Sequence, residues 1–414
     1  MTTSEVDFLL IGGGLASANC ARWLREEGAD GTVLVAGREP DPAYNRPELS
    51  KGYLRGEETK AEVYFRPEDW WREQRIDLRV RTSVTALDAA ARTATLSTNE
   101  EVSFGQALIA TGANVRRLSV DGCELEGIHY LRSFGNSDSI RDAARDAAEV
   151  VMIGGSFIGC EVAASLTALG KHCTILMPEA SPLENAFGRT MGGFFNDALS
   201  QRGVTIHGGD MLERFEGDGR VARVLSKGGL ELDADLVVVG VGVAPETQLA
   251  AKAGLDIGER GGVHCSSRLE SSVAGIYAAG DMCEYESMLH DGAPIRVEHW
   301  DVAFNHGKTV ALNMLGRDIA HEVVPYFYSV LAGIGELEYV GPAYTWDEEV
   351  LRGTVTDETF TNWYLRNGRV VAALTWGRPD DLDTARRLMK AATVLDAAQR
   401  AMLADPDVEL AEVG

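Results

Sequence analysis

Short apolar runs alternate with longer amphipathic stretches at the start of the chain. An apolar run covers residues 6–11, apolar positions then recur at helical spacing over 16–27, and a second apolar run covers 32–36. Short continuous apolar runs predict buried strands, and a 3.6-residue period predicts a helix with one buried face. The pattern therefore predicts a strand, a helix and a second strand in succession.

The same order of patterns returns in the middle of the chain. Residues 149–153 are predicted to form a strand, a helix is predicted to run to Ala168, and another strand is predicted over 173–177. Towards the C-terminus, the segments TNWYLRN and RVVAALTW alternate as strands do, and a helical pattern covers 382–403. Strands that alternate with helices are typical of an α/β fold.

Both predicted strand–helix junctions are rich in small residues. The first reads IGGGLAS and the second IGGSFIGCE. In such a turn the first glycine (Gly12, Gly154) permits a tight bend, and the middle position (Gly14, Ser156) lets the backbone approach a pyrophosphate. The N-terminus of the next helix offers free N–H groups to the phosphates. Two copies in this context predict two dinucleotide sites.

Each turn departs from the glycine fingerprint at one position. Ser17 takes the third glycine position of the first turn, where a small side chain still permits close helix–strand packing, and Gly159 takes it in the second. Ser156 replaces the middle glycine of the second turn. Its hydroxyl either crowds the pyrophosphate or donates a hydrogen bond to it, and the sequence leaves both open.

An acidic residue after the second strand of each unit is expected to bind the adenosine ribose. Glu179 has that place in the second unit, and no arginine adjoins it to receive a 2′-phosphate. We therefore expect NADH to be preferred over NADPH. In the first unit Arg38 and Glu39 stand together after the strand, so the acid comes one residue late.

Charge and composition exclude several classes of function. The 414-residue chain has a formal net charge of −24, which disfavours nucleic acid and anionic membranes as partners. No apolar run approaches the roughly 18 residues of a membrane span, and the N-terminus carries no signal-like stretch. The six cysteines include no C-x-x-C pair and are expected to be small buried residues. A cytoplasmic protein of two or three domains is expected.

The stretch AYNRPELSKGYL, which begins at Ala43, adds a more specific signal. Together with LIATGA, HYLRS, VGVGVAPE, IYAAGD, RVEHW and VPYFYS, it resembles the FAD-dependent NADH:ferredoxin reductases of the putidaredoxin reductase and dioxygenase type, which are related to apoptosis-inducing factor. The resemblance covers the whole chain. It implies an oxidoreductase that passes electrons from NADH through non-covalently bound FAD to a ferredoxin, of the 2Fe–2S or a similar type. That ferredoxin would serve an oxygenase or a haem-thiolate monooxygenase.

The resemblance also implies a domain organisation. Two Rossmann-like nucleotide-binding domains of the glutathione reductase type are expected, one inserted in the other, with a C-terminal α/β domain. The FAD-binding domain would comprise residues 1–117 and 245–324, and the NADH-binding domain residues 118–244. Residues 325–414 would form a dimerisation or partner-interface domain that covers the flavin. A monomer and a homodimer are both compatible with this organisation.

The matched motifs imply a set of FAD-binding residues. Arg46 and Lys51 would bring positive charge to the pyrophosphate and the flavin. Val84 would lie by the adenine, and Asp281 would bind the ribityl chain. The full implied set is Gly12, Gly13, Gly14, Ala16, Ser17, Arg38, Glu39, Arg46, Lys51, Val84, Ala110, Thr111, Gly112, Arg132, Gly280, Asp281, His299 and Trp300.

A second set is implied for NADH. Phe157 would cover the flavin until NADH displaces it, and Glu161 would pair with Lys51 near the flavin N5. Lys51 and Glu161 are thus the predicted catalytic residues, and no metal is expected. The implied NADH set is Gly154, Gly155, Ser156, Phe157, Ile158, Gly159, Glu161, Glu179, Gly242, Glu298 and Tyr328.

The chain departs from the family pattern at four positions. Arg38 stands where an acid is usual, and Glu246 replaces the asparagine of a Pro-Asn pair. Tyr328 and Val330 replace a tryptophan and an aspartate of the family pattern near the expected electron exit. The identity of the electron acceptor is therefore the least determined part of the resemblance.

Other functions are compatible with the same fold. A disulfide reductase or NADH oxidase would need a cysteine beside the flavin, where this chain has Ser50 and Lys51. A membrane quinone reductase would need a basic or aromatic amphipathic C-terminal helix. A redox sensor related to apoptosis-inducing factor stays open, because the predicted NADH strand ends in a similar sequence, MPEA.

A group of basic residues near the C-terminus is a candidate contact for an acidic ferredoxin, because opposite charges steer association. A solvated helix face is the alternative interpretation. The group consists of Arg366, Arg369, Arg378, Arg386, Arg387 and Lys390, and Asp380, Asp381 and Asp383 lie in the same stretch.

Overall fold

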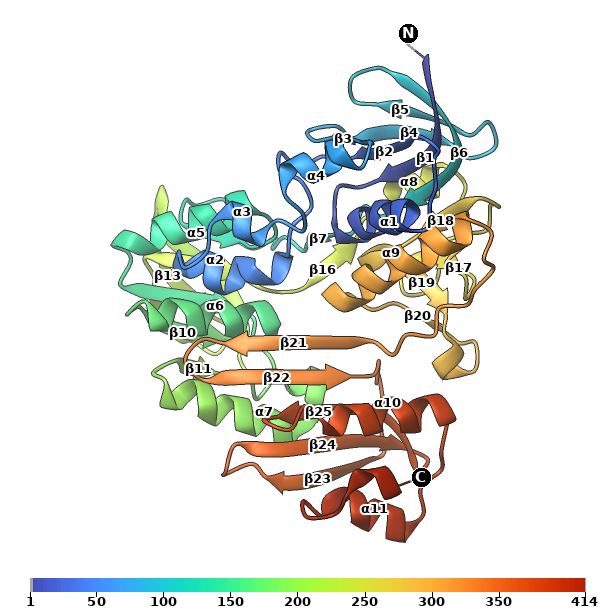
Figure 1. Cartoon of the computed structure of the whole chain (residues 1–414). Helices are drawn as coiled ribbons and strands as arrows, with labels where there is room; N and C mark the ends of the chain where they lie inside the picture. Colours follow the sequence, from blue (N-terminus) through green and yellow to red (C-terminus); the bar gives the residue numbers. More distant parts are fainter. Residues whose placement is uncertain (1–2, 414) are drawn as a thin grey trace.

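The computed structural model describes residues 3–413, and its first large sheet contains the N-terminal strands (Figure 1). The strand order is β3-β2-β1-β6-β5-β4, and β18 pairs with β6. The central strands are parallel, whereas β4 and β5 form an antiparallel hairpin. The bounds are β1 (Thr3–Ile11), β2 (Val33–Ala36), β3 (Ile76–Arg79), β4 (Val84–Asp88), β5 (Thr93–Leu96), β6 (Glu101–Ile109) and β18 (Ile276–Ala278).

Two helices pack together beside this sheet, α1 (Leu15–Glu26) and α9 (Trp300–Met314) (Figure 1). Their backbones approach closely at Gly307, where a Cβ atom would lie 2.4 Å from the Ala16 carbonyl oxygen. The predicted strand, helix and strand at the start of the chain are confirmed, with boundaries within three residues. Segments far apart in sequence thus build one unit.

A second, wholly parallel sheet contains the strands of the middle of the chain, in the order β11-β10-β9-β15-β8. Every residue of β15 is buried, as expected for a parallel sheet covered on both faces. The predicted strand over 149–153 and the helix end at Ala168 are confirmed. The bounds are β8 (Ile128–Tyr130), α5 (Phe134–Asp146), β9 (Glu149–Ile153), α6 (Phe157–Ala168), β10 (His172–Leu176), α7 (Glu184–Gln201), β11 (Thr205–His207) and β15 (Leu236–Val239).

A smaller antiparallel sheet packs against the second sheet through a shared apolar cluster. It consists of β12 (Leu212–Asp218), β13 (Arg220–Ser226) and β14 (Glu231–Asp233). Two further strands, β7 (Ala113–Val115) and β16 (Val243–Pro245), pair antiparallel with each other. The chain passes from the first sheet to the second through β7 and returns through β16.

The C-terminal sheet is antiparallel, in the order β21-β22-β25-β24-β23, and is drawn in orange and red in Figure 1. One face shares a core with α7, where Phe194 packs against Phe360 and Trp376. The helix α10 covers the other face. The bounds are β21 (Tyr326–Leu331), β22 (Gly335–Val340), β23 (Glu348–Thr354), β24 (Thr359–Arg366) and β25 (Arg369–Trp376), so the two predicted strands are confirmed.

The single helix predicted over 382–403 is wrong, because the structure has α10 (Asp381–Ala391) and α11 (Ala397–Ala404). Ala392 takes a left-handed conformation with φ 49°, which ends α10. Leu395 then donates its N–H to the Gly368 carbonyl. Asp396 caps α11 in a capping box with Gln399, a start signal that the apolar periodicity obscured.

The other elements are short segments that connect these units. They are η1 (Arg46–Ser50), α2 (Gly52–Arg55), α3 (Lys60–Val63), α4 (Glu68–Glu73), α8 (Gln248–Lys252), β17 (Val263–Cys265), η2 (Gly280–Met282), β19 (Cys283–Glu286), η3 (Met288–His290), β20 (Pro294–Ile295) and η4 (Leu410–Glu412). Within residues 3–413, none of the helices is both long and apolar enough to cross a membrane. All six cysteines are free, and all but the half-buried Cys123 are buried.

Candidate functional site

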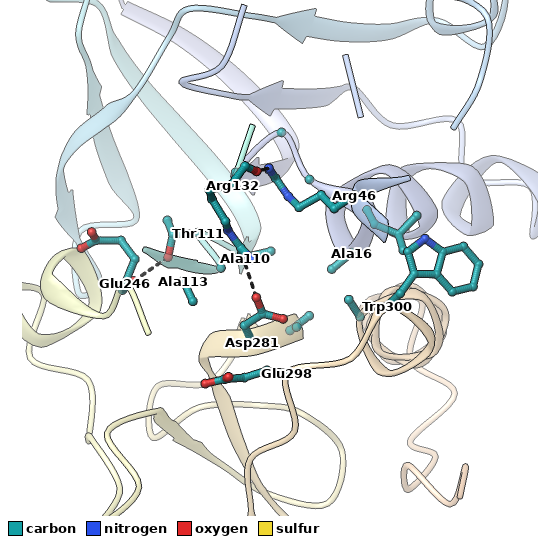
Figure 2. A pocket seen from close by; sticks show the side chains of 18 of the residues that line it. Ala16, Arg46, Ala110, Thr111, Ala113, Arg132, Glu246, Asp281, Glu298 and Trp300 are labelled. Carbon is teal, nitrogen blue, oxygen red and sulfur yellow. Dashed lines mark hydrogen bonds and ion pairs between the residues drawn. The ribbon is translucent and has the colours of Figure 1, made fainter. Parts of the chain in front are cut away.

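A cavity of about 570 Å³, seen from close by in Figure 2, is lined by residues from the units of all three large sheets. The first sheet contributes its glycine turn and strand ends, the second contributes the start of α6, and the C-terminal sheet contributes β21. Of the residues predicted to bind FAD, all line this cavity except Ser17. Ser17 is fully buried, and its hydroxyl has no hydrogen-bond partner within the described chain.

The glycine turn at the head of α1 has room for a phosphate. Gly12 has φ 114°, and a Cβ atom there would lie 2.2 Å from the Ala110 carbonyl oxygen, so only glycine fits. Gly14 caps α1, and a Cβ atom on Gly14 would meet nothing within 4 Å among the described atoms. No side chain of the described residues caps this helix. Its free N–H groups and positive dipole end therefore suit a pyrophosphate.

A hydrogen-bonded group around Arg46 forms one wall. Its guanidinium pairs with Glu39, and it donates to Tyr44 Oη at 2.7 Å and to the Arg132 carbonyl at 2.6 Å. Tyr44 also donates to the second oxygen of Glu39 at 2.6 Å. Burial opposes ionisation of Glu39, but the Arg46 charge and the hydrogen bonds from Arg46 and Tyr44 together outweigh burial and lower the pKa of that carboxyl. Both oxygens of Glu39 are thus engaged within the protein.

A second ion pair crosses the cavity from the loop before α5 to η2. Arg132 Nη2 lies 2.8 Å from Asp281 Oδ2, and both side chains point into the cavity in Figure 2. Asp281 follows β18, a parallel strand of the first sheet, at the carboxyl edge where ligands of such sheets bind. Arg296 donates to the Asp281 carbonyl at 2.9 Å and also pairs with Glu298.

One buried carboxylate connects three segments that lie far apart in the sequence, α6, the end of η1 and β21. Glu161, on α6, lies with its Oε2 atom 2.8 Å from Lys51 Nζ, and both residues are 4% exposed. Ser50 donates to Glu161 Oε2 at 2.5 Å, and Ser329 of β21 donates to Oε1 at 2.6 Å. A buried charge pair with its oxygens satisfied in this way is held in one geometry. The predicted pairing of Lys51 with Glu161 is present in the structure.

Aromatic rings border the same end of the cavity. The Phe157 ring lies 4.8 Å from Phe327, which in turn lies 4.5 Å from His299. Burial lowers the pKa of His299 to about 4, so its imidazole is neutral at pH 7. Its shielded Nδ1 atom has no partner among residues 3–413. Trp300 donates to Asn45 at 3.1 Å, and Tyr328 lies with its ring 6.0 Å from Lys51 Nζ.

A second cavity of about 330 Å³ lies at the glycine turn before α6. Gly154 has φ 105°, and a Cβ atom there would lie 2.4 Å from the Gly240 carbonyl oxygen. Ser156 donates its hydroxyl to that same carbonyl at 3.2 Å. The hydroxyl is thus hydrogen-bonded to a neighbouring backbone carbonyl, and the two alternatives, that it crowds the pyrophosphate or donates to it, stay predictions.

The predicted NADH residues divide between the two cavities. Phe157 lines both. The larger cavity also contains Ile158, Glu161, Glu298 and Tyr328, and the smaller contains Gly154, Gly155, Ser156, Glu179 and Gly242. Gly159 lines neither, because it packs behind the turn, where a Cβ atom would lie 2.0 Å from the Gly154 carbonyl oxygen.

Three polar residues of these sites escaped the sequence interpretation. Asn185 donates to Glu179 at 2.6 Å, and Ser50 and Ser329 bind Glu161. Both serines lie in motifs that carried the family resemblance, so a signal for them existed in the sequence. Asn185 lies in no such motif, and it reaches Glu179 from the first turn of α7.

Three of the six basic C-terminal residues make side-chain hydrogen bonds or ion pairs within the described chain. Arg387 donates to the carbonyls of Leu410 and Val413, and Arg378 pairs with Asp381. Arg386 pairs with Asp383, and its guanidinium also lies 5.5 Å from the Tyr326 ring, which lines the larger cavity.

Comparison with protein families assigns the two parts of the chain. Residues 6–307 match the pyridine nucleotide-disulphide oxidoreductase family, and residues 334–414 match the family described as reductase C-terminal. The first match covers both nucleotide turns, and the second covers the C-terminal sheet from β22 onwards.

Curated relatives match the chain over nearly its full length. The ferredoxin reductase subunit of 5,5′-dehydrodivanillate O-demethylase from Sphingobium sp. is 32% identical over 98% of both chains. The ferredoxin reductase component of chlorobenzene dioxygenase from Cupriavidus sp. is 34% identical over 95% of this chain and 94% of that protein.

Solved structures match the whole architecture. The ferredoxin reductase for the CYP199A2 system from Rhodopseudomonas palustris superposes with a TM-score of 0.92, at 29% identity, over 100% of this chain and 99% of that one. The covalent putidaredoxin reductase–putidaredoxin complex gives 0.92 at 28% identity, over 99% of this chain and 98% of that one. The expected α/β fold with two nucleotide-binding units is confirmed.

Proposed function

The chain belongs to the pyridine nucleotide-disulphide oxidoreductase family, and from this premise we propose that it is an FAD-containing reductase that transfers electrons from NADH to a ferredoxin. The observation that carries the proposal is Phe157, which borders both nucleotide cavities, with the Lys51–Glu161 pair beside it. A hydride donor in the smaller cavity and an acceptor in the larger one would meet at this ring.

The larger cavity fits FAD. Its glycine turn has space for a pyrophosphate, and the unpartnered His299 Nδ1 atom needs a polar neighbour that a flavin ring edge can supply. Arg46 and Arg132 bring positive charge to the same wall. We assign Asp281 to the ribityl chain, and we assign the remaining cavity-lining residues predicted for FAD to cofactor binding as well, except Glu39, whose two oxygens are engaged by Arg46 and Tyr44.

The smaller cavity fits the adenosine side of NADH. Glu179 lies at its edge and can accept hydrogen bonds from ribose hydroxyls, whereas a 2′-phosphate would meet its negative charge. Asn185 holds one carboxylate oxygen by a 2.6 Å hydrogen bond, which fixes the direction of the other. We assign the preference for NADH over NADPH to Glu179, with Asn185 as its positioning residue.

The chemistry requires little proton transfer by the protein. When bound, FAD accepts a hydride's two electrons together and releases electrons singly, which links NADH to a one-electron carrier. One NADH thus reduces two ferredoxins and leaves one proton. Lys51 places a fixed positive charge at the shared edge of the cavities, and Glu161 holds it there. The neutral His299 and the surrounding aromatic rings exclude water from that edge.

The geometry argues against the disulfide reductase alternative. Among the described residues that line either cavity there is no cysteine, and the five buried cysteines lie inside the packed cores. Ser50 and Lys51 occupy the segment where such an enzyme would place its reactive thiol. The free cysteines support the proposal of a reducing compartment, the cytoplasm.

We further propose the domain boundaries that the resemblance implies. The antiparallel pair β7–β16 supports an NADH-binding domain over about 118–244, inserted into an FAD-binding domain of 1–117 and 245–324. The C-terminal domain would cover the flavin side through β21, whose Ser329 reaches Glu161. This domain, near Arg386 and Tyr326, is the proposed contact for a 2Fe–2S ferredoxin.

Rapid-mixing spectroscopy tests the proposal. The purified protein is expected to be yellow, to bleach when mixed with NADH, and to recover its colour rapidly when an oxidised 2Fe–2S ferredoxin is added. A long-lived charge-transfer band with slow recovery would instead identify the redox sensor alternative. A colourless protein that takes up no FAD would overturn the proposed function altogether.

A further inference from the structure

Two unusual residues of the sequence are connected in the structure. Arg38 Nη2 donates to Asn114 Oδ1 at 2.5 Å, and Asn114 Nδ2 donates to Glu246 Oε2 at 2.5 Å. Arg38 stands where the family pattern has an acid, and Glu246 stands where it has asparagine. The arginine has thus gained a carboxylate partner through one bridging amide, so the two departures compensate each other in charge.

The backbone fixes Glu246 in this position. Its N–H donates to the Gly112 carbonyl at 2.8 Å, and its own carbonyl accepts the Thr111 hydroxyl at 2.6 Å. Figure 2 shows this second contact at the edge of the larger cavity. Asn114 lies on β7, one of the two paired strands that connect the nucleotide-binding units. The series of hydrogen bonds from Glu246 through Asn114 to Arg38 therefore begins at a residue whose backbone is held by two hydrogen bonds.

The location is the adenosine side of the larger cavity. In a β–α–β unit the pyrophosphate lies on the glycine turn, and the adenosine lies beyond the end of the second strand. Arg38 follows that strand, β2, and lines the cavity together with Ser83–Thr85 and Glu246. Glu39, the nearest acid at the strand end, has both oxygens engaged by Arg46 and Tyr44.

We propose that Arg38 is the residue that binds the adenosine half of FAD in this protein, with Asn114 and Glu246 as positioning residues. The inference rests on the proposed function for the presence of FAD. A guanidinium has five N–H donors, and the hydrogen bond to Asn114 leaves others for ribose hydroxyls and the adenosine-side phosphate. Glu39 is then a structural partner of Arg46 and has no part in ribose recognition.

The assignment predicts which flavins depend on Arg38. FMN and riboflavin lack the adenosine half, so their binding should not change when Arg38 is replaced. ADP contains the adenosine and both phosphates but no flavin, so its ability to compete with FAD should follow Arg38. The relevant measurements are the rate of FAD release from the diluted holoprotein, followed by flavin fluorescence, and the dissociation constants of FAD, FMN and ADP for the stripped protein.

Three variants and a matched control test the proposal. Arg38→Ala should weaken FAD binding about tenfold, and FMN binding should stay the same. Glu246→Ala should give a smaller loss of FAD affinity, whereas Glu246→Gln, which keeps an acceptor for Asn114, should stay within about twofold of the parent. Arg116→Ala is the control, because Arg116 is an exposed arginine that binds the Val243 carbonyl and lines neither cavity.

A double variant provides the most demanding test. Arg38→Glu alone would place two carboxylates at one asparagine and should weaken FAD binding. Arg38→Glu combined with Glu246→Asn gives the family combination and should recover most of that loss, so the two effects should not add. Equal losses for FAD and FMN, or an unchanged FAD affinity in Arg38→Ala, would overturn the inference. Such a result leaves the proposed function intact, because that proposal is tested by the uptake of FAD and by the reoxidation of the reduced flavin by ferredoxin, and neither depends on which residue binds the adenosine.

Discussion

The two glycine turns have nearly the same backbone but different surroundings. Gly12 and Gly154 have φ values of 114° and 105°, and each lies against a carbonyl at the end of a neighbouring parallel strand. The first turn opens onto space at Gly14, whereas the second is bridged by the Ser156 hydroxyl. The first cavity, at about 570 Å³, also exceeds the second, at about 330 Å³.

The difference fits the two occupants that we propose. A cofactor that stays bound needs contacts along its whole length, and the first cavity supplies them from three sheets. A substrate that leaves in every cycle needs fewer contacts, and the second cavity is smaller and lined by residues of one unit, Glu179 and Glu184 among them. The same glycine turn can thus belong to a site that retains its nucleotide or to a site that releases it. The surrounding side chains determine which of the two it is.

Replacing each turn glycine is the most direct way to separate the two sites. Gly12→Ala should abolish FAD retention, because the new methyl group would lie 2.2 Å from the Ala110 carbonyl oxygen and φ would remain strained. Gly154→Ala should leave the protein yellow but raise the NADH concentration needed for reduction at least about a hundredfold. Flavin absorbance and NADH titration measure these effects. A yellow Gly12→Ala protein with normal turnover would contradict the comparison.

Removing the carboxylate between the cavities should destabilise the protein. Glu161→Ala leaves Lys51 buried without its counter-ion, which should lower the free energy of unfolding by about 3 kcal/mol. Glu161→Gln keeps acceptors and donors for the two serines and should cost less stability. Ser329→Ala isolates the contact from β21 and should cost about 1 kcal/mol. Denaturant unfolding measures the stability of all three variants. Stabilities equal to that of the parent would show that Glu161 does not hold the three segments together.

The acid at the edge of the second cavity should set the nucleotide preference. The parent protein is expected to prefer NADH about tenfold, or about 1.4 kcal/mol. Glu179→Arg should shift this preference towards NADPH. Asn185→Ala should shift the same ratio in the same direction but less, because Glu179 keeps its charge and loses only its orientation. The ratio of kcat/KM values for the two nucleotides is the measurement. An unchanged ratio in Glu179→Arg would show that a residue other than Glu179 sets the nucleotide preference.

The two neighbouring arginines of α10 should behave differently. Arg386→Glu should raise the KM for ferredoxin about threefold at low salt, and the effect should shrink as salt screens the half-exposed charge. Arg387→Glu should instead lower thermal stability, because Arg387 holds two carbonyls near the C-terminus. Reduction of a small dye by NADH should be normal in Arg386→Glu. A salt-independent KM would exclude Arg386 from the docking surface.

The smallest expected effect concerns Glu48, which lies beside the Lys51 segment. Burial and the nearby Glu58 carboxylate raise the pKa of Glu48 from its ordinary value of 4.5 to about 7. Between these values the folded protein holds a proton that the unfolded chain releases, so the stability contributed by this group falls as the pH rises from about 4.5 to about 7. Glu48→Gln should therefore raise the melting temperature at pH 8 and leave it unchanged at pH 4.

Because Glu48 is only partly buried, solvent reduces this effect, and we expect a shift of about 1–2 °C. Differential scanning calorimetry at the two pH values measures it. Equal shifts at both pH values would show that a cause other than titration is responsible.

Local patterns predicted much of the fold and the outline of the sites. The glycine turns and their flanking strands follow from apolar periodicity, and the Lys51–Glu161 pair follows from the family resemblance. The contact between Ser329 and Glu161 spans 168 positions, and no local period records it. The break after Ala392 escaped because apolar residues continue across it. The sequence also does not reveal the hydrogen-bond partners of an acidic residue such as Glu39, because these partners are set by tertiary contacts.

The antiparallel pair β7–β16 has a consequence for how such proteins can be assembled. The chain leaves the first unit and returns to it at adjacent points, so the intervening segment begins and ends in one place. A segment with its ends side by side can be exchanged for another of different nucleotide preference without altering the path of the remaining chain. The fold is thus open to recombination at this joint, in evolution as in the laboratory.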